Sequence, residues 1–245
     1  MKAMVLAAGL GTRLRPLTND RPKALVEIGG RTLLEITLQK LREFGIREAI
    51  INVHHFAEMV IEYLRANDSF GMRIEISREN VLLDTGGGLK KAAWFFLDNA
   101  NETSEPFILH NVDVISSIDL GQMVRQHEQR QALATLAVQN RETSRYLVFD
   151  ENSQLCGRRP AHGQAEIVRQ SLATEELAFS GIHVISPAFL SLMNEKGVFS
   201  IVDCYLRVAG EGQKILAFRA DEYYWRDLGT QQSLRQAEED LRKLA

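Results

Sequence analysis

Short apolar runs alternate along this chain with stretches in which apolar residues recur at helical spacing. Between Thr32 and Phe44 the apolar positions fall on one helical face, and Gly45 follows where a helix commonly ends. The flanking apolar runs, Met4 to Leu6 and Ala49 to Val53, have the length of buried strands. Strands that alternate with helices in this way are typical of an α/β fold.

The same pattern continues toward the C-terminus. It predicts helices at 57–66, 89–97, 120–129, 189–193, 201–208 and 231–244. It predicts strands at 72–76, 107–109, 132–138, 146–149, 177–184, 215–218 and 223–225, with antiparallel order expected in this second half. We therefore expect a mixed, mostly parallel central sheet flanked by helices.

Composition narrows the class of protein. The 245 residues are 45% hydrophobic, which is enough for one domain over 1–245, with halves at about 1–115 and 116–245. The net charge of −3 gives no reason to expect a nucleic-acid or membrane partner. Cys156 and Cys204 lack disulfide or zinc spacing, and no apolar run is long enough to span a membrane, so we expect a cytoplasmic protein.

A glycine- and arginine-rich loop follows the first apolar run. Gly9 and Gly11 allow positive φ angles and close approach of the backbone to an anion, and Arg13, Arg15 and Lys23 bring positive charge to the same place. A triphosphate is the expected ligand, although a tight turn alone would also explain the two glycines. The spacing fits neither a P-loop nor a dinucleotide fingerprint.

The full string is Leu6-Ala-Ala-Gly-Leu-Gly-Thr-Arg-Leu-Arg-Pro16, followed by Pro22-Lys-Ala-Leu25. It closely resembles the signature of the sugar-1-phosphate nucleotidyltransferases. The resemblance implies a Rossmann-like nucleotidyltransferase fold in which the loop wraps a triphosphate, with Arg13 on its charged tail and Lys23 near the reacting centre. The nucleotide contacts that it implies in this loop are Leu6, Ala8, Gly9, Gly11, Thr12 and Arg13.

A second glycine cluster, Thr85-Gly-Gly-Gly88, follows the third predicted strand. In the family, a loop at this point lies against the nucleobase, which implies contacts from Thr85 and Gly86, while Glu79 stands where a polar residue reads the base edge. A carboxylate only accepts hydrogen bonds, so Glu79 favours UTP or GTP over ATP. Two alternatives stay open: the glycines permit a sharp helix entry, and Glu79 is a solvated loop acid.

Two aspartates far apart in the sequence resemble the family's magnesium ligands. Asp113 ends the segment Asn111-Val-Asp113, in which Val112 replaces a usual glycine, and Asp227 lies in Trp225-Arg-Asp-Leu-Gly-Thr230. Mg²⁺ prefers oxygen ligands and often takes only one or two carboxylates, with phosphates and waters completing its shell. Helix or turn capping by either aspartate is the alternative interpretation.

The sugar side is implied by weaker matches. Phe179-Ser-Gly-Ile182 looks like the strand beside the sugar, where Gly181 would let the sugar approach the backbone, and Asn111 would also contact the sugar phosphate. Arg159 stands where many relatives have a lysine that binds the sugar phosphate, and a guanidinium can hold a phosphate in two hydrogen bonds. An exposed turn at Arg159 is an equal alternative.

Taken together, these segments are similar to the small N-acetylmuramate-1-phosphate uridylyltransferases and mannose-1-phosphate guanylyltransferases. The implied reaction joins an NTP to a sugar 1-phosphate with release of pyrophosphate, by in-line attack at the α-phosphorus, with Mg²⁺ as cofactor and Arg13 and Lys23 as catalytic residues. A catalytically silent nucleotide-sugar-binding regulator on the same fold remains the alternative. Apolar positions on the terminal helix are compatible with a homodimer.

Overall fold

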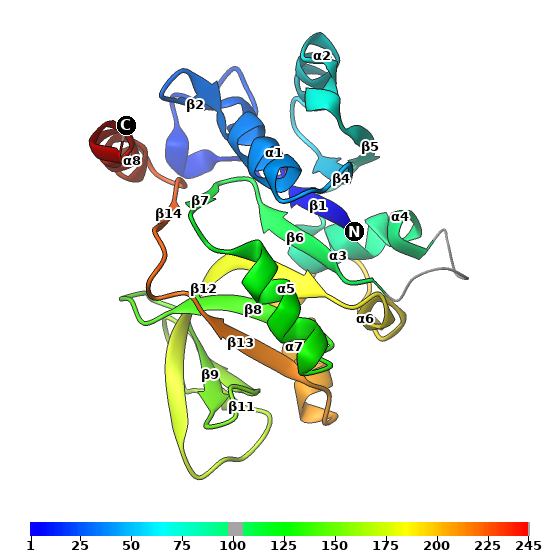
Figure 1. Ribbon diagram of the computed structural model, residues 1–245, viewed down its shortest axis with the longest axis vertical. Coiled ribbons are helices and arrows are strands. Elements are labelled where there is room, and N and C mark those ends of the chain that lie inside the picture. The colour runs from blue at the N-terminus through cyan, green and yellow to red at the C-terminus, as the bar shows by residue number, and fades with distance from the viewer. Residues whose placement is uncertain (98–104, 245) are drawn as a thin grey trace.

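A computed structural model describes residues 1–97 and 105–244, and the side chains of Leu241, Lys243 and Leu244 lie outside that description (Figure 1). One large sheet runs through both halves of the chain in the order β11-β10-β9-β12-β6-β1-β4-β5, with β8 between β12 and β13. Its strands are β1 (Lys2–Leu6), β4 (Glu48–Val53), β5 (Arg73–Arg78), β6 (Phe107–Asn111), β8 (Ala134–Gln139), β9 (Tyr146–Asp150), β10 (Leu155–Arg159), β11 (Glu166–Ile167), β12 (Thr174–Ile185) and β13 (Ile215–Arg219).

The sheet is mixed, as expected. β1 pairs in parallel with β4 and β6, and β4 pairs in parallel with β5. The long strand β12 then reverses direction and pairs antiparallel with β6, β8 and β9. The carboxyl ends of β1, β4 and β6 therefore meet at one edge of the parallel part, which is where ligands gather in such sheets.

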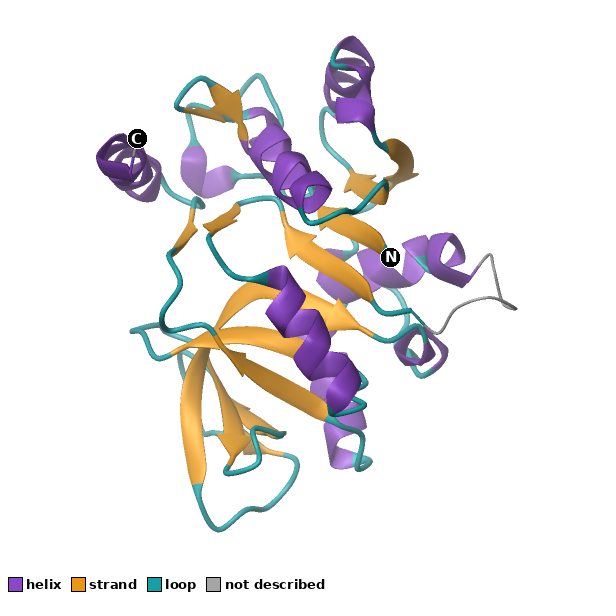
Figure 2. Cartoon of the chain, in the orientation of Figure 1, coloured by secondary structure: helices purple, strands orange, loops and turns teal. Residues whose placement is uncertain are grey.

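Helices cover both faces of this sheet (Figure 2). They are α1 (Leu33–Glu43), α2 (Ala57–Ala66), α3 (Asp84–Ala92), α4 (Trp94–Leu97), α5 (Leu120–Gln129), α6 (Ala188–Ser191), α7 (Ile201–Gly210) and α8 (Gln231–Leu244). Side chains alternate across a strand, so in β1 Ala3 and Val5 join the core beneath α1, while Met4 joins the core on the other side. β1 is buried on both faces, which explains its uninterrupted apolar run.

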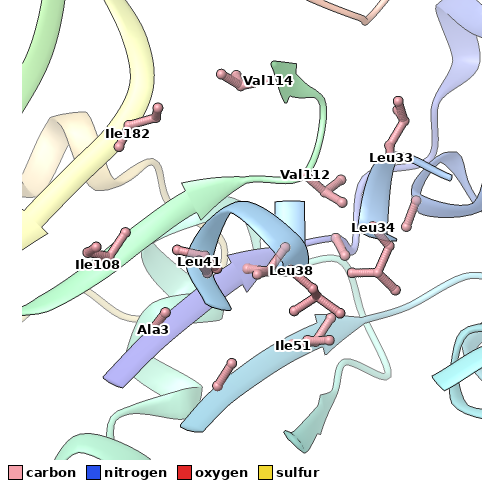
Figure 3. Packing of buried hydrophobic residues seen from close by; sticks show 14 of the residues in the cluster. Ala3, Leu33, Leu34, Leu38, Leu41, Ile51, Ile108, Val112, Val114 and Ile182 are labelled. Atoms are coloured by element: carbon pink, nitrogen blue, oxygen red, sulfur yellow. The ribbon is translucent and has the colours of Figure 1, made fainter. Parts of the chain in front are cut away.

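The core under α1 reaches the carboxyl end of β6 (Figure 3). Leu34, Leu38 and Leu41 are fully buried there, at the helical spacing noted in the sequence. Thr32 caps the helix, because its hydroxyl accepts a hydrogen bond from the N–H of Glu35 at 3.0 Å. This packing fixes α1 against the strand that carries Asn111.

Three predictions about local structure are wrong. The helix expected from Leu89 begins at Asp84, so the glycines form its first turns rather than a loop before it. The exposed turn that was one of two equal interpretations at Arg159 is not present, because Arg159 ends the strand β10, which is paired with β9 and the short β11. The strand predicted at 223–225 lies slightly later, at β14 (Trp225–Asp227).

Two short hairpin-like pairs complete the fold. β2 (Glu27–Ile28) pairs with β3 (Arg31–Thr32), and β7 (Val114–Ser116) pairs antiparallel with β14. On α8, Leu234 and Ala237 are buried in the core, which removes two of the apolar positions that were compatible with a homodimer. None of the helices in the described part of the chain is both long enough and apolar enough to cross a membrane.

Candidate active site

A cavity of about 350 Å³ opens at the carboxyl ends of β1, β4 and β6. Eight residues predicted to bind nucleotide, metal or substrate line it: Leu6, Ala8, Gly9, Lys23, Glu79, Thr85, Asn111 and Asp113. Its remaining lining residues are Asn52, Leu82, Asp84, Val112 and Val198. Gly11, Thr12, Arg13, Gly86, Arg159, Gly181 and Asp227 lie outside this lining.

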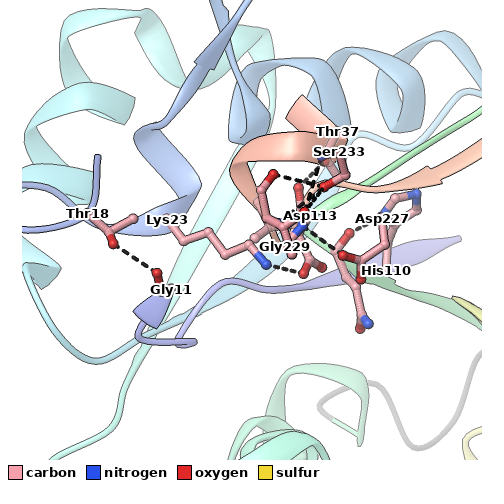
Figure 4. A network of polar contacts seen from close by, with 12 residues as sticks. Gly11, Thr18, Lys23, Thr37, His110, Asp113, Asp227, Gly229 and Ser233 are labelled. Carbon is pink, nitrogen blue, oxygen red and sulfur yellow. Dashed lines mark hydrogen bonds and ion pairs between the residues drawn. The ribbon is translucent and has the colours of Figure 1, made fainter. Parts of the chain in front are cut away.

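Lys23 and Asp113 meet inside the cavity, although 90 positions separate them in the sequence (Figure 4). The Lys23 ammonium donates to Oδ2 of Asp113 and forms an ion pair with it. Both side chains are largely buried, at 10% and 18% exposure. A buried lysine is stable in this place because the carboxylate compensates its charge.

Backbone pairing brings the second aspartate to the first. In the β7–β14 pair, Asp227 lies opposite Val114, and the N–H of Leu228 donates to the carbonyl of Asp113 at 2.8 Å. Oδ1 of Asp227 accepts the N–H of Gly229 at 2.7 Å. Backbone pairing thus brings the segments of Asp113 and Asp227 together, and their common role as metal ligands stays a prediction.

Val112 leaves this arrangement intact. Its side chain is 4% exposed and belongs to the core beneath α1 (Figure 3). Its N–H donates to the carbonyl of Leu6 at 3.1 Å, and its carbonyl accepts the hydroxyl of Thr37 at 3.4 Å. Val112 is absent from the residues with positive φ, so this position does not require glycine.

The glycine- and arginine-rich loop that follows β1 has the predicted positive φ at Gly11 but not at Gly9. Gly11 has a positive φ of 63°, and a Cβ there would lie 2.9 Å from Cγ2 of Thr18. Gly9 has no positive φ, and a Cβ there would meet nothing within 4 Å. The advantage of glycine at position 9 is therefore open space at the cavity wall, not an unusual backbone conformation.

Arg13 and Asp227 both lie close to Gly229. Arg13 lies in the short 3₁₀ turn Thr12–Leu14, which begins directly after Gly11. A Cβ on Gly229 would stand 2.6 Å from a guanidinium nitrogen of Arg13 and 2.6 Å from Oδ1 of Asp227. Gly229 therefore separates Arg13 from Asp227 with no space for a side chain.

Glu79 is not a solvated loop acid, because its side chain is buried at 4% exposure. Its Oε1 accepts from Nδ2 of Asn52 at 2.7 Å, and its Oε2 accepts the N–H of Leu83 at 2.9 Å. Asn52 in turn accepts the N–H of Ala7 at 2.7 Å. This chain of hydrogen bonds joins the ends of β1, β4 and β5 under the cavity. A carboxylate has about four lone-pair sites, so Glu79 keeps acceptor capacity toward the cavity.

The glycines of α3 serve close packing. A Cβ on Gly86 would lie 2.5 Å from the ring of Phe199, and one on Gly88 would lie 2.8 Å from Oε1 of Glu79. The hydroxyl of Thr85 accepts the N–H of Ile201 at 3.0 Å. Gly86 thus faces the segment before α7. Contact between Gly86 and the nucleobase stays a prediction, and this packing gives it no support.

The sugar-side candidates are only partly together. Gly181, with a φ of 73°, abuts Asn111, because a Cβ on this glycine would be 2.8 Å from Nδ2 of the asparagine. Oδ1 of Asn111 and Oγ of Ser180 are buried and lack hydrogen-bond partners in the described chain. Arg159 points elsewhere: its guanidinium forms two hydrogen bonds with Glu176 and lies 4.5 Å from the ring centre of Tyr146.

Sequence reasoning missed Arg141. This residue follows β8, and its guanidinium lies 3.7 Å from the ring centre of Trp225, two residues before Asp227. One Nη donates to the carbonyl of Phe179 at 2.8 Å. The surrounding sequence, Asn-Arg-Glu, has the composition of a solvated loop, so only the tertiary structure reveals this contact.

The chemistry of the donor set fits a divalent cation that prefers oxygen. Asp113 and Asp227 contribute two carboxylates from paired backbone segments, and the described residues contain no cluster of three or more His, Cys, Asp or Glu side chains suited to a metal. Two carboxylates are too few for a structural zinc site. They match Mg²⁺, which takes the remaining ligands from phosphates and water.

Comparisons with known proteins identify the family of this chain. Residues 2–243 match the family model described as nucleotidyl transferase. The N-acetylmuramate alpha-1-phosphate uridylyltransferase of Caulobacter vibrioides is 35% identical, over 98% of this chain and 96% of that protein. The mannose-1-phosphate guanylyltransferase catalytic subunit beta of Danio rerio is 30% identical, and the match covers 94% of this chain but 61% of that longer protein.

A solved structure has the same fold. The putative glucose-1-phosphate thymidylyltransferase of Bacillus anthracis superimposes with a TM-score of 0.80 at 20% identity, over 99% of this chain and 95% of that one. The Rossmann-like fold and the family that were expected from the Gly9–Pro16 motif are therefore confirmed. By its motifs, its fold and the match over nearly its whole length, the chain belongs to the nucleotidyl transferase family.

Proposed function

We propose that this protein joins an NTP, with UTP or GTP favoured, to a sugar 1-phosphate and releases pyrophosphate. The observation that carries the proposal is the cavity at the ends of β1, β4 and β6, which holds Lys23 and Asp113 and adjoins Asp227. The names of the relatives support the same class of reaction, since they are uridylyl- and guanylyltransferases.

The proposed reaction needs alignment of two anions rather than a base. The phosphate of the sugar substrate is already ionised, so its oxygen attacks the α-phosphorus in line and pyrophosphate leaves. In this scheme Lys23 stabilises charge at the α-phosphoryl group, and Arg13 holds the departing pyrophosphate. A divalent cation held by Asp113 and Asp227 would neutralise phosphate charge and orient the two substrates.

This scheme requires Lys23 to change partners. In the structure its ammonium neutralises Asp113, and a cation held by Asp113 and Asp227 would supply that charge instead, so that Lys23 could bind phosphate oxygens. Lys23 and the cation would then together neutralise the negative charge of the substrates. Glu79 is proposed to accept an N–H from the edge of the base, which uracil and guanine both present.

Pyrophosphate release tests the proposal directly. A panel of four NTPs against several sugar 1-phosphates, each with and without Mg²⁺, should give turnover for at least one pair and none without the cation. Nucleotide binding without pyrophosphate release for any pair would instead support a catalytically silent nucleotide-sugar-binding protein. The same panel identifies the base and the sugar.

A further inference from the structure

Two arginines are candidates to bind the sugar substrate, and they differ in how their charge is balanced. Arg159 is 43% exposed and forms an ion pair with Glu176 at 2.6 Å, with its ring contact to Tyr146. Arg141 is partly buried and, within residues 1–97 and 105–244, has no carboxylate at ion-pair distance. Of these two arginines, only Arg159 has a carboxylate at ion-pair distance in the described part of the chain.

Arg141 is held in place by neutral groups. Its guanidinium lies over Trp225, and one Nη donates to the carbonyl of Phe179. Its Nε is buried and lacks a hydrogen-bond partner in the described chain. Burial lowers the pKa of Arg141, and Asp227 partly offsets this effect, but an arginine still keeps its charge at neutral pH.

A charge that is partly removed from water without a counter-charge is unfavourable unless a ligand supplies one. The contacts of Arg141 also show where that ligand would be. Phe179 begins the segment that contains Ser180 and Gly181, and the indole N–H of Trp225 donates to the carbonyl of Ser180 at 2.7 Å. Arg141 therefore borders the place where Asn111 and Ser180 keep unpartnered oxygens.

Resting on the proposed function, we infer that Arg141, and not Arg159, binds the oxyanion of the sugar substrate. The guanidinium is a planar fork of donors that suits a phosphate or a carboxylate, and Trp225 and Phe179 orient it before the substrate arrives.

Kinetics of Arg141→Gln test this assignment, with Arg159→Gln as the matched control. Loss of a charged hydrogen bond should raise the KM for the sugar 1-phosphate by about ten- to a hundredfold and leave the KM for the NTP within about twofold. Arg159→Gln should change neither constant by more than about twofold. Arg141→Lys keeps the charge but not the fork, so its KM should fall between wild type and Arg141→Gln.

Two substrates distinguish the source of the oxyanion. If Arg141 binds the 1-phosphate, the KM rises equally for glucose 1-phosphate and glucuronic acid 1-phosphate. If it binds a sugar carboxylate, the rise is confined to glucuronic acid 1-phosphate. An unchanged sugar KM in Arg141→Gln, or an equal rise in the KM for the NTP, would overturn the inference.

Fluorescence provides a measurement that does not require turnover. The chain has two tryptophans, and Trp94→Phe leaves Trp225 as the only one. Glucose 1-phosphate or glucuronic acid 1-phosphate should alter Trp225 emission in this variant, and the response should disappear when Arg141→Gln is added. A response that persists in the double variant contradicts the inference, whereas absent pyrophosphate release in wild type with a persistent Arg141-dependent response contradicts only the proposed function.

Discussion

At the scale of single residues, the site depends on charges that the protein balances internally. Lys23 and Asp113 neutralise each other in a cavity that also receives Asn111 and Glu79. Neither charge can be removed without leaving the other partly buried and unpaired, which is the unfavourable case for an ion pair. Substitution of either Lys23 or Asp113 therefore tests the stability of the protein as well as its proposed activity.

Asp113→Asn and Lys23→Ala should each lower kcat by at least about 100-fold, because each removes a charge that the proposed mechanism places at the reacting phosphates. Both variants should stay folded, since neither side chain belongs to the apolar core, but each should melt at a lower temperature than wild type because the remaining partner loses its counter-charge. Pyrophosphate release and a thermal melt measure the two quantities. Near-normal turnover in either variant would refute the proposed catalytic site.

Gly229→Ala tests the space between Arg13 and Asp227. A methyl group there would stand 2.6 Å from atoms of both residues, so at least one of them must move. We expect kcat/KM to fall by about tenfold or more, because small displacements of aligned groups are costly in catalysis. A variant that keeps wild-type kcat/KM would show that Arg13 and Asp227 do not require this geometry.

At the scale of elements, α3 shows why a run of three glycines forms a helix here. Glycine lowers helix stability, but each of these positions faces an obstacle: Phe199 at Gly86, the carbonyl of Gly197 at Gly87, and Glu79 at Gly88. In return, the helix packs closely against the segment that precedes α7 and against the hydrogen-bonded pair Asn52 and Glu79. The packing of α3 thus connects the nucleotide side to α7.

Gly86→Ala should destabilise the protein by about 1–3 kcal/mol, because the new methyl group overlaps the Phe199 ring and the backbone nitrogen of Ile201. Gly210→Ala is the matched control: it also replaces a helical glycine, but its Cβ would lie 3.4 Å from Val168. Urea unfolding of both variants measures the difference. Equal stabilities would contradict the packing argument.

Prediction from sequence succeeded where one local signal decides the element. α5 and α8 have the predicted bounds, since their apolar residues recur at helical spacing between clear termini. It failed for α3, where tertiary contacts outweigh the low helix propensity of glycine. It also missed β7 and β11, because two- or three-residue strands have too few positions to show a pattern.

Some residues of the candidate site could likewise be predicted from local sequence, and others could not. Lys23, Asp113 and Asp227 were predicted because a long motif or a strand end identifies each one, and the structure brings all three together. Arg141 could not be predicted, because its environment comes from Trp225 and Phe179, which are distant in sequence. Arg159 was a candidate because a short segment resembles one in the family, with an exposed turn as an equal alternative, and that segment contains no information about the pairing of Arg159 with Glu176.

At the scale of the whole molecule, one sheet joins the two halves through the strand β12. Two histidines, one on β12 and one on α5, are buried. His183 on β12 contacts the hydroxyl of Tyr205 at 2.8 Å, and His127 on α5 contacts the hydroxyls of Thr135 and Ser186 at 3.0 and 2.9 Å. Burial lowers the pKa of His127 to about 4 and that of His183 to about 3. Both side chains are therefore neutral in the native protein at physiological pH.

These two histidines should make the protein sensitive to mild acid. Below a pH of about 6.5 the unfolded chain binds protons that the native state does not, so the free energy of unfolding falls as the pH decreases toward 4. Each histidine contributes a slope of up to about 1.4 kcal/mol per pH unit in this window. Urea unfolding between about pH 7 and pH 4.5 measures the slope.

His127→Gln should reduce that slope by the contribution of one group, because glutamine keeps a donor and an acceptor but does not titrate. His55→Gln, at an exposed position, should leave the slope unchanged. A His127→Gln protein with the wild-type slope would show that His127 protonates equally well in the folded and unfolded states.

The pairing of β7 with β14 has a consequence for biosynthesis. The strand that carries Asp227 begins at Trp225, so more than nine-tenths of the 245-residue chain must be synthesised before this carboxylate can join Asp113. A nascent chain that has released only its first half from the ribosome already contains the phosphate loop and Lys23, but not the second aspartate. Premature termination before Trp225 would therefore leave a product without Asp227, the second of the two proposed metal ligands.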